Sequence, residues 1–274
     1  MNEEVVRNTH KIYFDSINDF YKYITETPLN ESFRWEDLSS SRKGDVSFRG
    51  TSSFEEAAEL LKNGWTEQTE KLNNILKVEG KFETASACKI TQSVEGYHPI
   101  VPLYLMGIPT NMVSKKVVPM KQKIVTLNKS INYSAVITKE EIVNESIKAF
   151  KLIKKLESQN YKVNLNLVLG VAASSFRNKD TEIYYVKIRL KSANEKLNIS
   201  KLSFPLIHPS MLRRLCLRFE EVYPTVSRSF ICGYGSPLRP EEMRELSKKD
   251  EYLLPQFIKK DISKINSLDD LENL

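Results

Sequence analysis

The sequence has few of the residues that build catalytic metal centres. Of its 274 residues, three are histidine and three are cysteine. The histidines, at positions 10, 98 and 208, do not have metal-ligand spacing, and the cysteines, at positions 88, 216 and 232, form no Cys-x-x-Cys pair. We therefore expect no metal and no cofactor, and we expect buried, reduced thiols in a cytoplasmic protein.

Long apolar runs and common catalytic motifs are also missing. No apolar stretch is long enough to span a membrane, and the mixed, acidic N-terminus does not have the pattern of a signal peptide. There is no Gly-x-Ser-x-Gly elbow, and Gly233-Tyr-Gly235 is too short for a phosphate-binding loop. These absences argue against a membrane protein and against the enzyme classes that carry such motifs.

Positive charge is concentrated in the middle of the chain. Residues 115–228 carry 22 basic and 9 acidic side chains, a net charge of +13, although the whole chain has a formal net charge of only +6. The flanking segments 1–114 and 241–274 are both net acidic. A segment with this charge is typical of polyanion-binding proteins. The alternative is that the lysines solvate exposed faces while the acidic flanks offset their charge in space.

The strongest secondary-structure pattern lies in the same central segment. The spacing of apolar residues predicts a strand at Lys123–Leu127, a helix at Lys139–Gln159 and a second strand at Val163–Ala173. Thr138 and Glu141 have the spacing of a capping box at the start of the helix. Because a helix leads into a continuously apolar strand, a partly parallel sheet is favoured. The sequence therefore predicts an α/β or α+β fold with a mixed sheet.

Helical patterns dominate the N-terminal part of the chain. Ser52 with Glu55 is expected to cap a helix that ends at Gly64, with Trp65 folded back on its last turn. The periodicity fails between Val78 and Met120, where four prolines exclude long helices and leave room for strands. The predicted organisation is a mainly helical part at 1–114, a basic mixed α/β domain at 115–240 and an acidic helical tail at 241–274.

One predicted strand and one predicted helix carry the candidate binding residues. In the strand Glu182–Lys191, alternation sends one aromatic and three basic side chains to the same face. In the helix that opens at His208-Pro209, arginines lie on two sides of the apolar stripe. Basic side chains beside an aromatic suit phosphate contacts and base stacking. The candidate nucleic-acid-binding residues are Tyr185, Lys187, Arg189, Lys191, Arg213, Arg214 and Arg218.

Both elements also have a purely structural interpretation. The basic strand face could be the solvent side of an edge strand, where lysine blocks aggregation. On the helix, Arg218 and Glu221 are three positions apart and could pair with each other at the surface.

Several short motifs are spread over most of the chain. They are Phe48-x-Gly-Thr-x-Ser followed by Glu56-Ala57, then Gly64-Trp65, then His208-Pro-Ser-Met-Leu-Arg-Arg, and finally Tyr234-Gly. The combination resembles a pattern in uncharacterised proteins of phages and plasmids, although Gln68 stands where that pattern often has glycine. The resemblance implies a viral or mobile-element origin, with the host cytoplasm as the location, and it implies no activity.

A second resemblance concerns the end of the first strand in the central segment. Asn128-Lys-Ser130-Ile-Asn132 stands where von Willebrand factor A-like domains have Asp-x-Ser-x-Ser and ligate Mg²⁺. The resemblance implies a three-layer, Rossmann-like sheet domain. Because the aspartate is absent and a lysine lies within the motif, we expect no metal to bind there.

A non-enzymatic nucleic-acid-binding protein of a phage or mobile element is the function that these patterns favour. Its basic surface would lie on the central α/β domain and would bind DNA or RNA. The first alternative is a protein-interaction or assembly component with a protein partner. The second is an enzyme or a protein linked covalently to nucleic acid, for which Ser174-Ser175 after a buried strand is the one suggestive serine placement. No membrane partner is expected.

Overall fold

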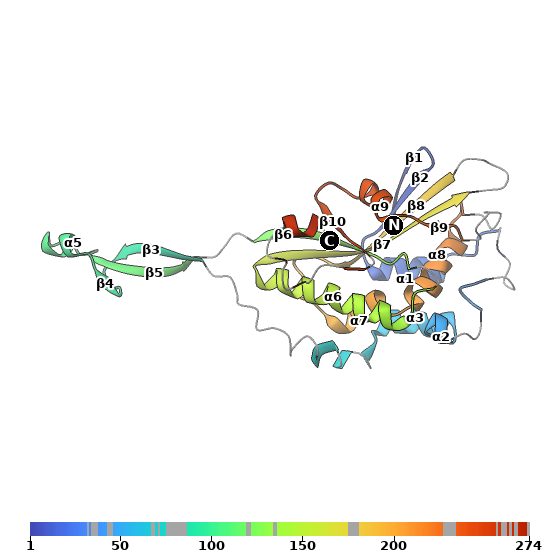
Figure 1. Cartoon of the computed structure of the whole chain (residues 1–274), viewed down its shortest axis with the longest axis horizontal. Helices are drawn as coiled ribbons and strands as arrows, with labels where there is room; N and C mark the ends of the chain where they lie inside the picture. Colours follow the sequence, from blue (N-terminus) through green and yellow to red (C-terminus); the bar gives the residue numbers. More distant parts are fainter. Residues whose placement is uncertain are drawn as a thin grey trace.

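A seven-stranded mixed sheet organises the part of the chain that the structure describes (Figure 1). This computed structural model describes residues 1–31, 33, 38–42, 46–66, 69–70, 72–74, 87–118, 122–133, 136–174, 181–226, 234–255, 257–258, 262, 265 and 268–272. The sheet has parallel and antiparallel pairs and packs against helices. The predicted α/β fold is therefore confirmed.

The strands of this sheet come from both ends and the middle of the chain. In spatial order they are β1 (Asn2–Val6), β2 (Thr9–Phe14), β8 (Thr181–Lys191), β7 (Tyr161–Ser174), β6 (Lys123–Ser130) and β10 (Glu251–Leu254), with β9 (Ser236–Pro237) beside β7. β6 pairs in parallel with β7 and β10, and β2 pairs in parallel with β8. β7 and β8 form the predicted antiparallel pair.

The predicted strand, helix and strand of the central segment are present as β6, α6 (Lys139–Ser158) and β7. The capping box is formed: the Glu141 N–H donates to Thr138 Oγ1 at 3.3 Å, and the Thr138 N–H donates to Glu141 Oε2 at 2.8 Å. Asn160 follows the helix with a φ of 69°, the left-handed conformation that suits asparagine after a helix end. Both strands are longer than predicted, because β6 continues to Ser130 and β7 begins at Tyr161.

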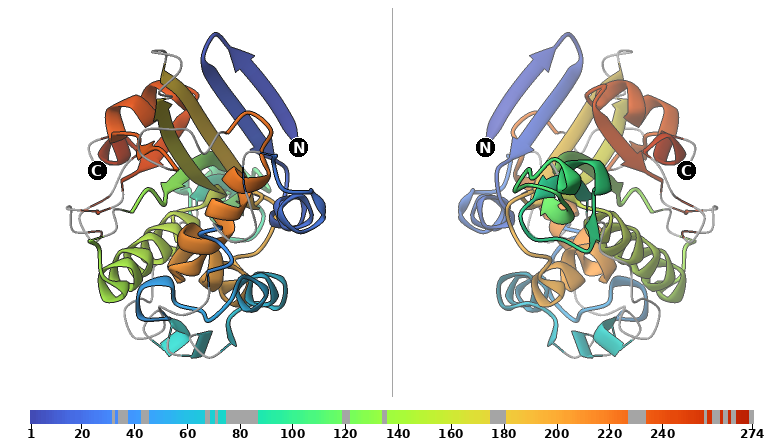
Figure 2. Two further views of the ribbon diagram at one scale, coloured as in Figure 1. Left: turned by 90° about the vertical axis from the view of Figure 1, so that its right-hand side faces the viewer. Right: turned by 90° about the vertical axis from the view of Figure 1, so that its left-hand side faces the viewer.

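One face of the sheet carries a layer of helices and the main apolar core. Leu127, Leu165 and Ile188 from three strands are almost fully buried there with Phe150 of α6. Figure 2 shows these helices together on one side of the sheet. Besides α6, they are α1 (Ile17–Glu26), α2 (Val46–Arg49), α3 (Phe54–Asn63), α7 (Ile199–Ile207), the π-helix η2 (Met211–Cys216) and α8 (Leu217–Val222).

The structure adds detail to the predicted helices at the starts of α1 and α3 and in the helix after His208. Ser16 caps α1 by accepting from the Asp19 N–H at 3.1 Å. The cap of α3 is Ser53, which accepts from the Glu56 N–H, so the predicted box at Ser52 and Glu55 is one residue too early. The helix predicted to open at His208 instead follows α7, and its first turns are π-helical.

The opposite face of the sheet is covered only in part. α9 (Pro240–Leu246) packs there, and Met243 and Leu238 contact Val168 and Tyr185 of the sheet in a second, smaller core. α10 (Asp269–Glu272) contacts β10 at the edge of the sheet. The part of this face that α9 leaves open contains the cleft described below.

The predicted division of the chain does not match the organisation of the sheet. Residues 2–14 form β1 and β2, so the part expected to be mainly helical supplies two strands of the sheet. The expected boundary at residue 114 falls inside a strand, and β10 joins the tail to β6. The reason is that parallel pairing unites segments that are far apart in the chain, which local periodicity does not register.

A narrow arm projects from the end of the molecule along its long axis (Figure 1). We use the name arm for residues 87–118, which lie within the segment where helical periodicity fails. It is a three-stranded antiparallel sheet with one short helix at its tip. Its elements are β3 (Ala87–Ser93), β4 (His98–Pro99), α5 (Val101–Leu105) and β5 (Met112–Val118).

Among the helices of the described residues, none has the length and apolarity needed to cross a membrane.

Candidate functional site

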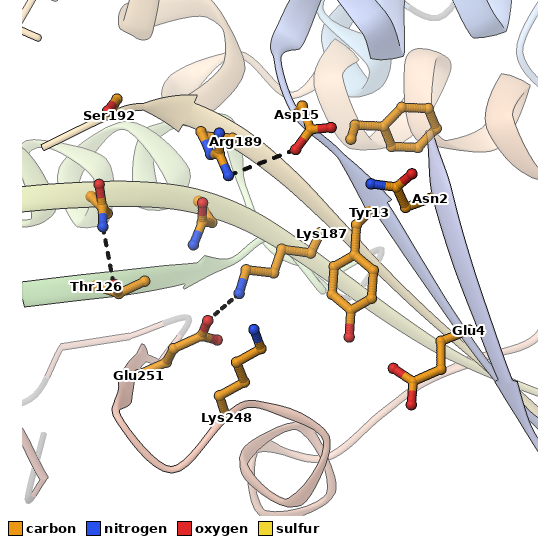
Figure 3. Close-up of a pocket in the computed structure, with 13 residues that line it drawn as sticks. Asn2, Glu4, Tyr13, Asp15, Thr126, Lys187, Arg189, Ser192, Lys248 and Glu251 are labelled. Carbon is orange, nitrogen blue, oxygen red and sulfur yellow. Dashed lines mark hydrogen bonds and ion pairs between the residues drawn. The ribbon is translucent and has the colours of Figure 1, made fainter. Parts of the chain in front are cut away.

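The open face of the sheet has a polar cleft of about 530 Å³ (Figure 3). Strands β1, β2, β6, β7, β8 and β10 and the segment just before β10 line it. Two of the predicted nucleic-acid-binding residues, Lys187 and Arg189, lie in this cleft, on the strand face that alternation predicts. The charged side chains of its lining are Glu4, Asp15, Lys187, Arg189, Lys248 and Glu251.

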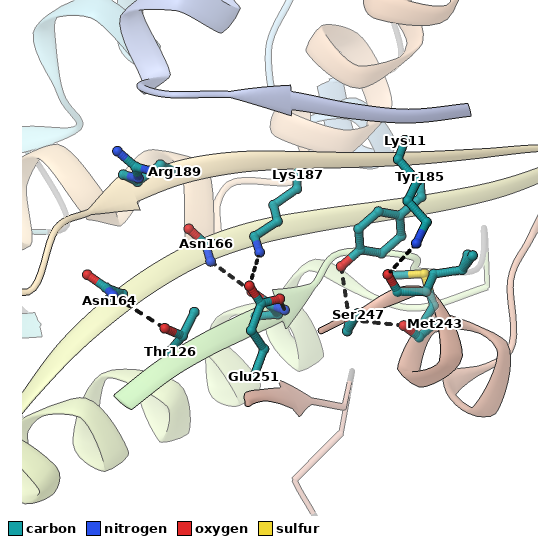
Figure 4. Close-up of polar contacts among 12 residues, drawn as sticks. Lys11, Thr126, Asn164, Asn166, Tyr185, Lys187, Arg189, Met243, Ser247 and Glu251 are labelled. Carbon is teal, nitrogen blue, oxygen red and sulfur yellow. Dashed lines mark hydrogen bonds and ion pairs between the residues drawn. The ribbon is translucent and has the colours of Figure 1, made fainter. Parts of the chain in front are cut away.

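Lys187 is already engaged within the chain. Its Nζ forms an ion pair and hydrogen bond with Glu251 Oε1, and both side chains are mostly buried. Asn128 Nδ2 donates to the other oxygen of Glu251 at 2.7 Å, and Asn166 Nδ2 donates to Asn128 Oδ1 at 2.8 Å (Figure 4). This network ties β10 to three strands of the sheet, so Lys187 has a structural partner for its charge.

Arg189 is the more accessible of the two. Its side chain is 53% exposed, and its Nη2 lies 3.7 Å from Asp15 Oδ1, a loose surface pair. The cleft as a whole balances three acidic against three basic side chains. A polyanion site requires an excess of positive charge, which this cleft does not have. The cleft therefore does not form the basic surface expected from the sequence.

Two other residues of the predicted strand face are covered. Tyr185 is 1% exposed beneath α9, and its hydroxyl lies 3.0 Å from Ser247 Oγ, so the expected stacking on a base is wrong for this ring. Burial raises the pKa of its phenol. Lys191 is 2% exposed and forms an ion pair with Glu157 of α6 at 2.9 Å. A register shift between β7 and β8 at Leu165 and Asn166 interrupts the alternation that placed Lys191 with the others.

The edge-strand interpretation of this strand is also wrong. β8 lies between β2 and β7 in the sheet, and both neighbours pair with it. Its basic residues therefore do not protect a free sheet edge from aggregation.

The three predicted arginines of the helix are buried on the helical side of the sheet. The relative exposure of Arg213 is 6%, that of Arg214 is 0% and that of Arg218 is 5%, so the expected exposed flank is wrong. Their guanidinium groups donate mainly to the loop that precedes α3, which contains the short helix α2, and Arg213 also donates to the Ile137 carbonyl at 2.8 Å. We therefore do not place a nucleic-acid surface at these residues.

Each arginine holds a different part of that loop. Arg214 donates to the carbonyl oxygens of Ser40 at 2.9 Å and of Thr51 at 2.6 Å. Arg213 donates to the carbonyl oxygen of Phe48 at 2.5 Å and lies over the Phe48 ring.

Arg218 completes the set by donating to Ser41 Oγ at 2.9 Å. It also pairs with Glu221 at 3.6 Å, as the structural interpretation predicts, although the pair is buried rather than at the surface. Glu221 in turn accepts from the Ser40 N–H at 3.0 Å and from the Tyr234 hydroxyl at 2.7 Å. The arginines and Glu221 thus act together as a buried clamp on the loop.

The short sequence motifs converge on this same region. Ser210 Oγ lies 3.0 Å from Thr51 Oγ1 and donates to the Arg49 carbonyl at 2.6 Å. The Trp65 ring meets the His208 ring edge-on at 4.7 Å between centroids. We use the name motif cluster for residues 48–53, 64–65 and 208–214. Its contacts give the motifs a structural role, which is to join the loop before α3 to the helical layer.

His208 is neutral in this cluster. Burial, together with the positive charge of Lys139, lowers its pKa to about 4. Its Nδ1 accepts from the Ser210 N–H at 3.2 Å, and its ring stacks on Phe204. It therefore works as a packed, hydrogen-bonded ring, not as an accessible base.

The position of the von Willebrand-like motif holds no metal-binding arrangement. Asn132 hydrogen-bonds to the backbone of Gly170, and Lys129 is fully buried with its Nζ donating to the Pro255 carbonyl at 2.8 Å. Burial lowers the Lys129 pKa to about 8. Across the described ranges, no group of three or more histidine, cysteine or acidic side chains could hold a metal ion. Of the serine pair suggested for catalysis, Ser175 lies outside the described residues.

The arm carries a largely uncovered apolar surface. Tyr104 is 65% exposed, Leu105 78% and Met106 71%, and no residue of α5 is buried. On its strands, Lys89 stands directly opposite Lys116, and Lys115 Nζ lies 5.3 Å from the centre of the Tyr97 ring. The arm thus combines an apolar tip, Tyr104–Met106, with a basic stem that carries Lys89, Lys115 and Lys116.

A family model described as a domain of unknown function, DUF7192, matches residues 2–271. The chain belongs to this family. No curated protein matches the chain, and no solved structure matches it. The DUF7192 match runs from β1 to α10, so it includes the sheet, the motif cluster and the arm.

The arm of this DUF7192 protein is the exposed feature that reasoning from the sequence missed. Its signal is the run Ile100-Val-Pro-Leu-Tyr-Leu-Met106, which has the composition of a core segment. Pro99 and Pro109 flank it and Pro102 lies within it, which leaves room only for short elements. An apolar run too short and too interrupted to reach a core is the pattern that could have indicated an exposed tip.

Proposed function

We propose that this protein is an interaction component, of the kind that a phage or mobile-element assembly uses, and that it binds a protein partner through the arm. The observation that supports the proposal is the apolar surface of the arm. Of the thirteen large apolar side chains that are exposed in the described part of the chain, seven lie on the arm. They are Ile90, Val94, Tyr97, Val101, Tyr104, Leu105 and Met106.

The shape of the arm explains why these side chains have no cover within the chain. A three-stranded sheet with a five-residue helix has no second layer, and the seven-stranded sheet lies beyond its base (Figure 1). Covering one such side chain contributes about 1.5–3 kcal/mol, so a partner that covers several would bind with a substantial apolar contribution. Contiguous apolar patches on a soluble protein are typical of interaction sites.

The composition of the tip suits a protein partner. Tyrosine and methionine are enriched at the centres of protein interfaces, and methionine adapts its unbranched side chain to irregular grooves. Tyr104 and Met106 flank Leu105, the most exposed of the three. We therefore place the centre of the interface at α5 and the residue that follows it.

Capture of partners in the cells that produce the protein tests this proposal. The variant Leu105→Asp with Met106→Asp would keep the strands of the arm and remove the apolar tip. Val136→Asp is a matched control, because Val136 is 87% exposed and lies outside the arm. We expect cross-linking and mass spectrometry to recover the same protein partner with the parent and the control, and not with the tip variant. Recovery of that partner by the tip variant would contradict the proposal.

A second candidate function is nucleic-acid binding, and the stem of the arm is the observation that favours it. Lys115 lies over the Tyr97 ring, a combination that suits phosphate contact and base stacking, and Lys89 and Lys116 are directly opposed on the same two strands. Titration of labelled DNA and RNA, single- and double-stranded, at low and moderate salt would measure it. If the stem binds phosphates, the double variant Lys115→Gln with Lys116→Gln should have a shallower slope of log binding constant against log salt concentration. The slope should fall by about one for each phosphate contact that the variant loses. No binding at low salt would remove this candidate.

A further inference from the structure

We propose that the partner of the arm is a second copy of this chain, and that the arm of one copy docks on the β1 edge of the next. The proposal rests on the proposed function, because it uses the same arm. It adds the identity of the partner and the surface that receives the arm.

The receiving surface is the outer edge of β1. In the described strand order, β1 is the terminal strand and pairs only with β2, so the other side of its backbone has no strand partner. Every residue of β1 is exposed, and its apolar residues Val5 and Val6 are 53% and 52% exposed. Met1, at the other end of the strand, is 47% exposed. A free edge with apolar side chains and no lysine or proline is a template for another strand.

The arm presents a complementary edge. In its sheet, β5 is the central strand and β3 pairs only with β5, so β3 also has one free side. β3 spans seven residues, Ala87–Ser93, and carries Ile90 at 65% exposure in its middle. Its length is sufficient to pair with all five residues of β1.

Charge selects β1 over a second arm as the partner. Lys89 and Lys116 are directly opposed across the ladder, an arrangement that repels, and no acidic side chain of the described residues forms an ion pair with either. Pairing two arms would bring more lysines together. β1 instead carries Glu3 and Glu4, and no described basic residue forms an ion pair with Glu4.

The positions of the two edges determine the symmetry of the contact. The arm and the β1–β2 hairpin lie toward opposite ends of the long axis (Figure 1), and the hairpin extends beyond the helical layer (Figure 2). An arm that docks on β1 of the next copy therefore leaves its own β1 free for another arm. Contacts of this kind produce linear chains or rings of copies, and the smallest closed form is a reciprocal pair in which each arm docks on β1 of the other copy.

The experiment uses two full-length variants that block opposite sides of the contact. Val5→Asp with Val6→Asp places charge on the β1 edge, and Ile90→Asp with Leu105→Asp does so on the arm. Val136→Asp is again the control. All substituted side chains are exposed, so thermal melting should change little in each variant. Molar mass is then measured by light scattering over a wide range of protein concentration.

We expect the parent and the control to increase in mass with concentration and each blocked variant to remain a monomer. An equimolar mixture of the two variants should form a dimer and nothing larger, because one contributes an intact arm and the other an intact β1. A β1 variant that still self-associates, or a mixture that stays monomeric, would overturn the proposal. A monomeric parent at all concentrations would also overturn it, while arm-dependent capture of a different protein would leave the proposed function standing.

Discussion

Asn132 and Gly170 are joined by two hydrogen bonds that run in opposite directions. Asn132 Nδ2 donates to the Gly170 carbonyl at 2.8 Å, and the Gly170 N–H donates to Asn132 Oδ1 at 3.0 Å. A carboxamide has one donor and one acceptor group, so it can satisfy both backbone groups of Gly170 at once. At this position the side chain joins the end of β6 to β7 and leaves no oxygen arrangement for a cation.

Replacement of Asn132 by aspartate should therefore destabilise the fold. A carboxylate cannot donate to the Gly170 carbonyl and would place a charge at a residue that is only 3% exposed. We expect a loss of about 3 kcal/mol or more in the free energy of unfolding at neutral pH, measured by urea denaturation. Asn132→Ala should cost less, because it removes both hydrogen bonds without adding a charge. Equal stability of the aspartate variant and the parent would contradict this role.

Substitutions of the buried and the exposed arginines of the predicted site should differ in their effect on the free energy of unfolding. Arg214→Gln leaves the buried carbonyl oxygens of Ser40 and Thr51 without their donor, so we expect a loss of about 3 kcal/mol or more. Arg189→Gln is the matched control, because its side chain is 53% exposed and its ion pair is loose. Its effect should stay within about 0.5 kcal/mol. Chemical denaturation of both variants measures the contrast, and similar losses for the two would refute it.

Glu220 should make the protein less stable as the pH rises. Burial, reinforced by the charge of Glu221, raises the pKa of Glu220 well above its usual value. The folded state therefore retains a proton that the unfolded chain releases above about pH 4.5, so stability falls from there until the pH passes the folded pKa. Glu220→Gln keeps the shape and removes this titration. It should melt higher than the parent at pH 8 and close to the parent at pH 4, and a constant difference would contradict the assignment.

His208 should have the opposite pH dependence. Its pKa is lowered to about 4 in the folded state from an ordinary value of 6.5, so the unfolded chain takes up a proton first as the pH falls. The stability it contributes is complete above pH 6.5 and is lost as the pH falls toward 4, by about 3 kcal/mol at most.

The difference between the parent and His208→Asn, measured across this range, isolates the effect of the histidine from that of Glu220. Substitution also removes ring packing against Trp65, which lowers stability by the same amount at every pH. The expected signature is therefore a difference that shrinks as the pH falls from 7 to 4. A difference independent of pH would mean that His208 does not titrate as described.

Features determined by a few neighbouring residues could be predicted from the sequence. The capping box at Thr138, the left-handed residue Asn160 and the buried Trp65 after Gly64 are all confirmed. Gly64 has a φ of 84°, and a Cβ there would approach the Ser200 carbonyl oxygen to 2.9 Å. Glycine is required here both by the positive φ and by the close approach of Ser200. Only the positive φ could be inferred from the sequence.

Features determined by distant partners could not be predicted. β2 pairs with β8, and Lys187 pairs with Glu251, 64 positions away. Alternation correctly placed Lys187 and Arg189 on one face, but it contains no information on which acids lie opposite them. The arginines of the helix were expected at the surface because arginine usually lies there. Their burial depends on a loop that is more than 160 positions away in the chain.

The π-helix at Met211–Cys216 has a consequence for how this family can vary. A π turn contains more residues than an α turn, so a single deletion in this segment could restore regular α-helical winding. The following residues would then rotate by about 100° relative to those before the deletion. Arg218 would turn away from Ser41 even though every motif residue was still present. The number of residues between His208 and Arg218 is thus a constraint in its own right: we expect relatives to accept substitutions within this interval but not insertions or deletions.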